Sequence, residues 1–417
     1  MVHVAREFIP WLLTKVTCSQ DRYILKFCVM NPQPFKYCID TPQPGKAIAS
    51  PFVLVAGWIV SEEGSDISDP TLVNEARDEH SLATVLRPDV EAAYPNCSVL
   101  GFQQYISSAG IAEEKTWFVE FLLDGNSYRF PIAWSLFPEV VQKFRQQKRD
   151  KLEKIRQILR CPICEKHTLQ EFGQLLRCQN CKAEFSFNAE HYDFLNRTLQ
   201  EHGKVKPTAN VSANEYDPIA LNIIEQFRDG LILDNGSGLR GDYYDNVVNF
   251  EIVDYPTTDV ISIGEKLPFK SEVFDAVFSF SVLEHVRNPF ECAREIHRVL
   301  KPGGTLYVSV PFLQPFHGYP DHYYNMTSSG LKNLFPQLQI LESGVLPPGW
   351  PIWTLSWFLN SYVRGLPSEV AEKFKNMKVS ELLGNPLEYL KEDFVQQLRP
   401  EVQEELAACN YMIAKKL

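Results

Sequence analysis

The sequence lacks the features of membrane-spanning and secreted proteins. No stretch reaches the roughly 18 apolar residues that a membrane-spanning helix requires. The apolar segment at residues 8–13 (FIPWLL) is too short for the core of a secretory signal, and no small-residue cleavage site follows it. Together with the cysteine pattern described below, these absences predict a cytoplasmic protein.

The sequence also has fewer basic than acidic residues. The chain has 41 Lys and Arg against 52 Asp and Glu, a formal net charge of -11. An acidic chain is a poor default partner for a phosphate backbone, so this balance argues against nucleic acid as the main partner. With 45% hydrophobic and 12% aromatic residues over 417 positions, the chain can instead bury cores in two or three domains.

Only ten cysteines are present, and four of them form two CxxC pairs. Cys161 and Cys164 make the first pair, and Cys178 and Cys181 make the second. Two such pairs at this separation can place four thiolates tetrahedrally around Zn²⁺, whereas a redox site needs only one pair. The sequence therefore predicts a small zinc ribbon at 161–198. We expect its metal to have a structural role, because so short a segment cannot form a stable hydrophobic core without a bound metal or a similar cross-link.

Residues 1–140 are predicted to form a β-sandwich. Short β-branched or aromatic runs alternate with Pro, Gly, Asp and Asn, without helical patterns between them. The runs lie at 23–30, 52–60, 82–86 and 117–123. After the last run, Asp124-Gly125 indicates a hairpin, and we expect Asn126 to lengthen its loop.

A charged helix at 141–160 is expected to link the sandwich to the ribbon. Lys and Arg number eight between positions 143 and 160, and such a run could contact nucleic acid. The helix also carries an apolar stripe, which favours a docked connector helix. The stripe consists of Phe144, Leu152, Ile155 and Leu159.

The remaining domain, residues 199–417, is organised around LILDNGSGLRGD at 231–242. Apolar residues followed by an acid and glycines indicate a buried parallel strand that feeds a tight turn. Glycine is needed there because a Cβ would keep the backbone away from a ligand. Glu251 follows Asp234 at close to the ~20-residue offset at which a carboxylate reaches a nucleotide ribose.

Further motifs follow in a fixed order: LPF at 267–269, FDAV at 274–277, LEH at 283–285 and KPGG at 301–304. In order and spacing, these motifs and the glycine loop resemble the class I S-adenosylmethionine-dependent methyltransferases. The resemblance implies an α/β Rossmann-like domain and an enzyme that uses S-adenosylmethionine. The fold class expected for the whole chain is therefore multidomain: β-sandwich, zinc ribbon and Rossmann-like methyltransferase.

The resemblance also implies roles for individual residues. Asp234 would orient the turn and approach the amino group of the cofactor. Gly236 and Gly238 would let the backbone lie against its methionine portion, and Glu251 would accept both ribose hydroxyls. Ser279 falls at the carboxyl end of the fourth strand, where ligands bind in open α/β sheets.

Two positions depart from the pattern of the family. Arg240 stands where the third glycine is usual, which leaves the path of the loop open. Ile263 replaces the acid that often accepts from the adenine amino group, so adenine would be held by apolar contact and backbone groups. Both departures keep open a non-catalytic protein that retains the cofactor pocket.

Histidine is the expected base for removing a proton from the methyl acceptor. A sugar hydroxyl is a poor nucleophile near neutral pH, and the ordinary pKa of histidine, ~6.5, suits a general base. We rank His322 first, because Asp321 and two tyrosines adjoin it in the segment after the fifth strand. His317 is second and His285 third. The same side chains could instead pack as a lid.

The acceptor hypothesis comes from the N-terminal third. GWIVSEEG at 57–64 and RPDVEAAYP at 87–95 are similar to a sandwich module that accompanies glycosyltransferases and methyltransferases of surface-polysaccharide synthesis. Trp58, Arg87 and Asp89 could face a sugar, or Trp58 could be core while Arg87 pairs with Asp89. On this basis we expect methyl transfer to a hydroxyl of a saccharide or lipid-linked glycan.

An RNA methyltransferase is the alternative, because the ribbon resembles zinc ribbons that precede some methyltransferase domains, including ribosomal-RNA ones. A C-terminal insertion starts with the apolar segment 346–363, which could rest on a membrane surface or close over a lipid-linked substrate. A buried helical lid or dimer face would also explain that segment. Strands at 338–341 and 411–414 are expected on either side of the insertion.

Overall fold

The structure is a computed structural model that divides into two compact units. The first unit runs to Val205 and continues through Ala209–Phe278 and Arg298–Tyr307, and the second holds Lys206–Thr208, Ser279–His297 and Val308–Leu417. The described residues are 34–42, 47–48, 52–74, 79–85, 87–107, 116–132, 135–206, 215–318, 321–410, 412 and 415. The segment at 8–13, the strand predicted at 23–30 and most of that predicted at 411–414 lie outside them.

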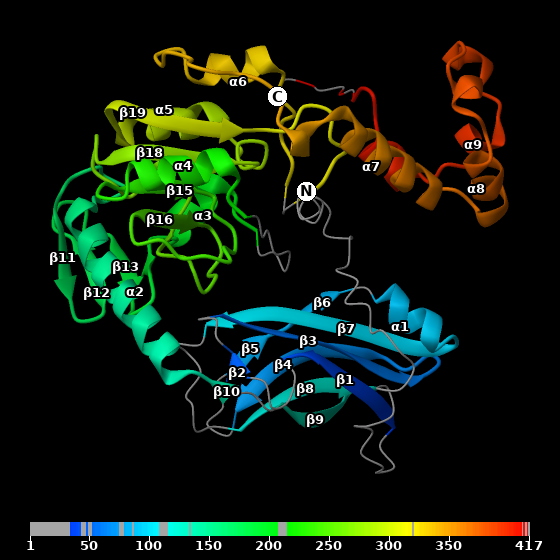
Figure 1. The fold of residues 1–417 in the computed structure, drawn as a ribbon, viewed down its shortest axis with the longest axis horizontal. Coiled ribbons are helices and arrows are strands. Elements are labelled where there is room, and N and C mark those ends of the chain that lie inside the picture. Colours follow the sequence, from blue (N-terminus) through cyan, green and yellow to red (C-terminus); the bar gives the residue numbers. More distant parts are fainter. Residues whose placement is uncertain are drawn as a thin grey trace. The chain divides into compact units, whose positions relative to one another are not determined.

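Two four-stranded antiparallel sheets form the N-terminal part of the first unit (Figure 1), in the orders β1-β3-β7-β6 and β5-β4-β8-β9. Their strands are β1 (Phe35–Thr41), β3 (Phe52–Glu62), β4 (Ile67–Asn74), β5 (Glu79–Ser81), β6 (Ala83–Val85), β7 (Cys97–Ser107), β8 (Trp117–Leu123) and β9 (Asn126–Ile132). Besides them lie the short strands β2 (Ala47–Ile48) and β10 (Ser135–Leu136) and the helix α1 (Pro88–Ala93).

One hydrophobic core contains buried side chains of both sheets. Burial alternates along β8, where every second residue from Trp117 to Leu123 is buried, as the period of a strand requires. Leu123 pairs with Asn126, so the β8–β9 loop is only Asp124-Gly125. Both loop residues have positive φ, 50° and 77°, as tight two-residue hairpins require. The expectation that Asn126 lengthens this loop was wrong, because Asn126 already belongs to the strand.

The charged helix is α2 (Pro138–Ile158), and its predicted apolar stripe is buried. Three of the eight basic residues between 143 and 160, namely Lys148, Lys151 and Arg160, are buried as well. Four short strands follow as an antiparallel meander: β11 (Leu169–Phe172), β12 (Leu175–Cys178), β13 (Glu184–Phe187) and β14 (Tyr192–Asp193). The helix α3 (Arg197–Gly203) comes next.

A parallel sheet begins after the helix α4 (Pro218–Gln226). Its strands β15 (Ile232–Asn235), β16 (Val247–Glu251), β17 (Val260–Ile261) and β18 (Phe274–Phe280) pair in parallel, and β19 (Leu300–Ser309) lies beside β18. The 3₁₀ turn η1 (Gly264–Lys266) and the helix α5 (Pro289–Val299) lie between these strands in the chain. The order β17-β16-β15-β18-β19 places β15 and its glycine turn in the middle of the sheet (Figure 1).

The cysteine-containing meander and the parallel sheet form one continuous nine-stranded sheet. They join where β14 pairs in parallel with β17, with Tyr192 opposite Val260 and Asp193 opposite Ile261. The N–H of Phe194 extends this ladder by donating to the carbonyl of Ile261 at 2.8 Å. The sequence did not predict this junction, which ties residues around 192 to an edge of the parallel sheet.

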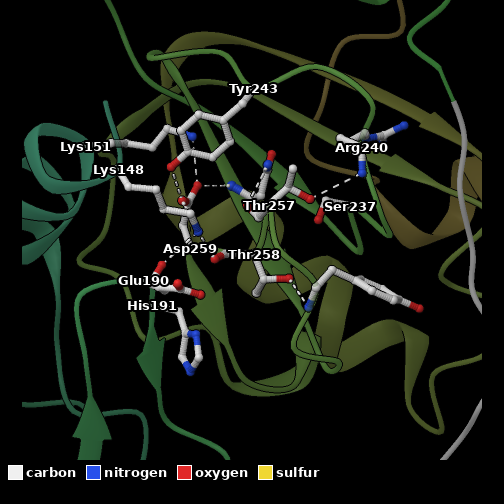
Figure 2. A network of polar contacts seen from close by, with 12 residues as sticks. Lys148, Lys151, Glu190, His191, Ser237, Arg240, Tyr243, Thr257, Thr258 and Asp259 are labelled. Atoms are coloured by element: carbon white, nitrogen blue, oxygen red, sulfur yellow. Dashed lines mark hydrogen bonds and ion pairs between the residues drawn. The ribbon is translucent and has the colours of Figure 1, made fainter. Parts of the chain in front are cut away.

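A buried polar network attaches α2 to the start of β17 (Figure 2). Nζ of Lys151 lies 2.9 Å from Oδ2 of Asp259, and Nζ of Lys148 lies 3.5 Å from its Oδ1. The Tyr243 hydroxyl and the Asn249 N–H also donate to this carboxylate. Burial lowers the pKa of Lys151 to about 8 and also lowers that of Lys148, although the charge of Asp259 opposes both shifts.

The C-terminal part of the second unit is helical. It contains α6 (Ser328–Leu334), η2 (Pro347–Gly349), α7 (Pro351–Arg364), α8 (Ser368–Lys375), η3 (Val379–Leu382), η4 (Pro386–Glu388), α9 (Asp393–Gln396) and α10 (Pro400–Glu405). A small core of Leu366, Val370, Phe374, Leu398 and Val402 holds the helices from α7 to α10 together. None of the helices in the described ranges is long and apolar enough to cross a membrane.

The strand predicted at 338–341 was wrong. Residues 339–346 have no regular secondary structure, and Leu341 is 84% exposed. Among the described residues, no strand follows β19. The short apolar run therefore lacks the sheet partner that a buried strand requires.

Breaking the network at Asp259 should loosen β17. Asp259→Ala leaves two buried lysines without their counter-ion, and removal of one partner of a buried pair typically costs about 3–5 kcal/mol. Hydrogen exchange of peptides spanning 247–263 should become faster in this variant. Arg197→Ala, which removes an exposed pair with Glu201, is the control and should leave these peptides unchanged. Equal protection in wild type and Asp259→Ala would contradict the importance of the network.

Candidate functional site

The four predicted zinc ligands lie together in the first unit. Sγ of Cys161 is 3.6 Å from that of Cys181, and Sγ of Cys164 is 3.4 Å from that of Cys178. All four sulfur atoms lie within 4.8 Å of one another and could hold a metal ion. Tetrahedral Zn–S bonds of about 2.3 Å place sulfurs about 3.8 Å apart, so the cluster fits Zn²⁺.

The glycine loop follows β15 as the sequence predicts. Gly236 and Gly238 have φ of +79° and +61°, values that a residue with a Cβ rarely adopts. The N–H groups of Gly236 and Ser237 donate to the carbonyl of Phe250 at 2.9 and 3.0 Å, which fixes the turn against the end of β16.

Asp234 is completely buried at the start of this turn. Its Oδ2 accepts from the Tyr216 hydroxyl at 2.6 Å and from Nε of Arg240 at 2.9 Å. Its Oδ1 is buried without a hydrogen-bond partner. A buried acceptor in this state is a natural place for a donor of the ligand, such as an amino group.

Arg240, the residue in place of the third glycine, therefore turns back into the loop. Its guanidinium pairs with Asp234 and lies 4.1 Å from the ring centroid of Tyr216. The charge of Asp234 is thus balanced within the protein. The contact with Tyr216 was not predicted, because in the sequence Tyr216 is only an aromatic residue just before the N-cap of α4.

Glu251, at the end of β16, is brought into direct contact with the glycine loop. Its Oε2 accepts from the N–H of Gly238 at 2.8 Å, and its Oε1 accepts from that of Ile252 at 2.8 Å. Burial raises the pKa of this carboxyl group, although both N–H donors oppose the shift. Each carboxylate oxygen can accept a second hydrogen bond, which fits a pair of ribose hydroxyls.

Ile263 lies just after β17 and is buried. A Cβ added at Gly203 in α3 would lie 2.9 Å from Cγ2 of Ile263, so these two residues are in close contact. Ser279, near the end of β18, is also buried but belongs to the second unit. The roles of Ile263 and Ser279 toward the cofactor stay predictions.

The three candidate histidines lie together in the second unit. The rings of His317 and His322 are 4.2 Å apart between centroids, and those of His285 and His317 are 5.1 Å apart. Glu284 joins them, because its carboxylate and ring nitrogens of His285 and His317 lie within 4.8 Å of one another. In the sequence, Glu284 stands out only as part of the LEH motif.

Backbone contacts define the tautomers of these rings. Nδ1 of His285 lies 2.7 Å from the carbonyl oxygen of Asp321, and Nδ1 of His317 lies 2.8 Å from that of Pro315. A carbonyl only accepts, so Nδ1 carries the proton and Nε2 the lone pair in both rings. In His322, by contrast, Nδ1 accepts from the His317 N–H at 3.2 Å, and Nε2 lies 3.0 Å from Oδ1 of Asn325.

Burial sets the charge states of this cluster. It lowers the pKa of all three histidines, that of His317 to about 4, so the rings are neutral near pH 7. It raises the pKa of Glu284 to about 8. The lone pair of His322 Nδ1 is engaged by a backbone N–H, and the pKa of His317 is low, so the identity of the base stays a prediction.

Comparison with known proteins adds the identity of the parallel sheet. Residues 245–308, from just before β16 to β19, match the family model described as a methyltransferase domain. This part of the chain is a methyltransferase domain. The match contains Glu251, Ile263, Ser279 and the LEH motif, whereas the glycine loop precedes it.

Two curated proteins match short parts of the chain. An uncharacterized protein of Methanocaldococcus jannaschii is 43% identical over 51 residues, 12% of this chain and 25% of that protein. A tRNA U34 carboxymethyltransferase of Desulfotalea psychrophila is 40% identical over 63 residues, 14% of this chain and 20% of that enzyme. The chain thus matches a quarter or less of the length of either relative.

Solved structures give weaker similarities. A Haemonchus contortus phosphoethanolamine N-methyltransferase 2 is 14% identical with a TM-score of 0.24, covering 80% of this chain and 68% of that one. A chain from the complex between the Haloferax volcanii Trm112 methyltransferase activator and a methyltransferase is 16% identical with a TM-score of 0.24, covering 30% and 70%. Scores of this size carry no conclusion for this chain.

Glu251 offers the sharpest test of the cofactor site in the methyltransferase domain. Glu251→Ala should weaken S-adenosylmethionine binding markedly, because the ribose hydroxyls would lose their acceptor and the loop its contact at Gly238. Isothermal titration calorimetry measures this loss. Glu272→Ala, at an exposed turn before β18, is the control and should bind like wild type. Unchanged affinity in Glu251→Ala would overturn the assignment of Glu251.

Proposed function

We propose that the chain transfers the methyl group of S-adenosylmethionine to a hydroxyl oxygen of a saccharide or lipid-linked glycan. The use of S-adenosylmethionine as the methyl donor is supported by the contact between Glu251, which lies in the methyltransferase domain, and Gly238 in the glycine loop that precedes it. Methyl transfer is an in-line displacement from a sulfonium, so the main task of the protein is to align donor and acceptor.

The residues around the glycine loop fit the cofactor. Oδ1 of Asp234, buried and without a hydrogen-bond partner, would accept from the amino group. The backbone of Gly236 and Gly238 would lie along the methionine portion, and Glu251 would accept from the ribose. The cofactor supplies the methyl group, while these side chains hold it in one orientation.

Two features support a glycan over a nucleic acid. The net charge of -11 opposes binding of a polyphosphate. In the basic helix α2, Lys148 and Lys151 form buried ion pairs with Asp259, so less of the helix's positive charge is available to an external partner. In addition, the start of α7 exposes Ile352, Leu355 and Phe358, a surface that suits a lipid-linked substrate or a membrane surface.

In the N-terminal part of the first unit, Trp58 fits a role in sugar binding better than Arg87 does. Arg87 pairs with Asp89 in α1 at 2.7 Å and with Asp40 in β1 at 2.6 Å, so this arginine joins the start of α1 to β1. Trp58 is half-buried, and its ring lies 5.7 Å from that of Tyr94. We infer that Trp58 and Tyr94, rather than Arg87, would stack on a sugar.

RNA methylation is the second candidate, favoured by the similarity to the tRNA U34 carboxymethyltransferase. Mass spectrometry of glycans and RNA from cells with and without this protein separates the two candidates. A methyl group lost from RNA alone would reject the glycan hypothesis. A third candidate, a cofactor-binding protein without catalysis, would show no transfer of label from S-adenosylmethionine to either extract.

We assign the acceptor side of the reaction to His285, His317 and His322. His317→Ala and His322→Ala should each lower turnover by ~10²-fold, the usual scale for a group that handles the acceptor proton, while cofactor affinity stays near wild type. His297→Ala, an exposed histidine in α5, is the control. Turnover that survives both changes would place acceptor activation elsewhere.

We further infer one structural Zn²⁺ at the four cysteines and a cytoplasmic location. Thiolates that bind a metal must remain reduced, which a cytoplasmic environment allows. The zinc ion would hold the short meander β11–β14, which carries only a few buried apolar residues of its own.

A further inference from the structure

We propose that Glu284, His285 and His317 form a second metal site, distinct from the four cysteines, which binds a divalent first-row transition-metal ion. One carboxylate oxygen and one ring nitrogen from each histidine lie within 4.8 Å of one another. All three residues belong to the second unit. Two imidazoles and one carboxylate are a ligand set that suits Zn²⁺, Mn²⁺ or Fe²⁺ and leaves positions open for another ligand.

The first supporting observation is the state of Glu284. Its side chain is completely buried, and neither carboxylate oxygen has a hydrogen-bond partner. Buried carboxylates are almost always hydrogen-bonded, paired or bound to a metal, so this exception needs a partner. A cation coordinated by Glu284 would supply it.

The second observation is the orientation of the two histidines. Each donates its Nδ1–H to a backbone carbonyl, that of Asp321 for His285 and that of Pro315 for His317. Metal-binding histidines characteristically donate one ring N–H to a carbonyl or carboxylate, which fixes the ring and leaves the other nitrogen for the ion. Both rings thus have the arrangement that is typical of metal-binding histidines, and both lie beside one buried carboxylate.

The third observation is the spacing between ligands. Nε2 of His285 lies 3.9 Å from Oε1 of Glu284. This separation is too long for a hydrogen bond. It fits two ligands of one ion, since metal–ligand bonds of about 2.0–2.2 Å allow their atoms to lie up to about 4 Å apart.

The surrounding segment holds these ligands in place. The backbone carbonyl of Glu284 accepts from the N–H of Tyr323 at 2.7 Å, which joins the LEH motif to the segment around His322. His322 in turn accepts the backbone N–H of His317. His322 is therefore a positioning residue for His317 in this site.

The role of the ion rests on the proposed function. An acceptor hydroxyl bound to the ion would lose its proton to water more readily, because the cation stabilises the alkoxide. In this role His285 and His317 act as ligands, not as bases.

Electron paramagnetic resonance with Mn²⁺ on the full chain tests the site. Mn²⁺ is poorly suited to thiolates, so the four cysteines should not compete for it. Wild type should bind one Mn²⁺ per chain, and Glu284→Gln and His317→Ala should each weaken binding by at least about tenfold, the scale on which even supporting residues act. His297→Ala, on the same unit but outside the cluster, should bind like wild type.

Two controls make the outcome decisive. S-adenosylmethionine calorimetry and thermal melting show whether each variant is folded, and a folded Glu284→Gln that binds Mn²⁺ like wild type overturns the proposal. The proposal is also overturned if the wild-type chain binds no Mn²⁺ and binds no Zn²⁺ beyond the one ion expected at the four cysteines. Metal binding without any methyl transfer would instead reject the proposed function and leave the metal site standing.

Discussion

The buried carboxylate of Asp259 is the point on which the arrangement of the first unit depends. It lies at the start of β17 and receives donors from three separate stretches of chain: Lys148 and Lys151 in α2, Tyr243 after the glycine loop, and the backbone of Asn249 in β16. Each of these groups would be costly to leave buried alone. Their mutual pairing therefore makes the docking of α2 and the position of β17 a single cooperative event.

This constraint explains why the cysteine cluster and the methyltransferase domain share one sheet. The edge of a parallel sheet exposes unpaired backbone groups unless another element covers it. Here β14 covers β17, and Gly203 of α3 packs on Ile263 just beyond that strand. The four cysteines lie before β11 and around the turn after β12, in the part of the chain that supplies β14. A metal at the cysteines would thus act on residues 259–263 through main-chain pairing, without touching the cofactor loop.

The parts of the fold that could be predicted depend on local patterns. The glycine turn after β15, the buried stripe of α2 and the run at β8 follow from side-chain periodicity and turn residues close in sequence. The burial of Lys151 could not be predicted in this way, because its partner Asp259 is distant in sequence and a basic run on a helix usually faces water. The same holds for the ion pair of Arg240 with Asp234, where the sequence showed a departure from a pattern but not its counter-ion.

The environment of Glu284 could not be predicted from local sequence patterns either. In the sequence this residue is only part of the LEH motif, whereas its buried, unpaired carboxylate and its proximity to His317 depend on the fold. A strand expected at 338–341 failed for the opposite reason, because an apolar run alone does not supply a partner strand. Sites assembled from distant segments thus need the fold before their chemistry can be inferred.

The pairing of β14 with β17 connects the cysteine cluster to the methyltransferase domain, and calorimetry on Cys161→Ser tests this connection most directly. This variant should lose zinc in elemental analysis, keep a folded methyltransferase domain, and bind S-adenosylmethionine more weakly than Cys97→Ser, which changes an exposed cysteine outside the cluster. A Cys161→Ser protein that has lost its zinc and still binds the cofactor with wild-type affinity would contradict the account.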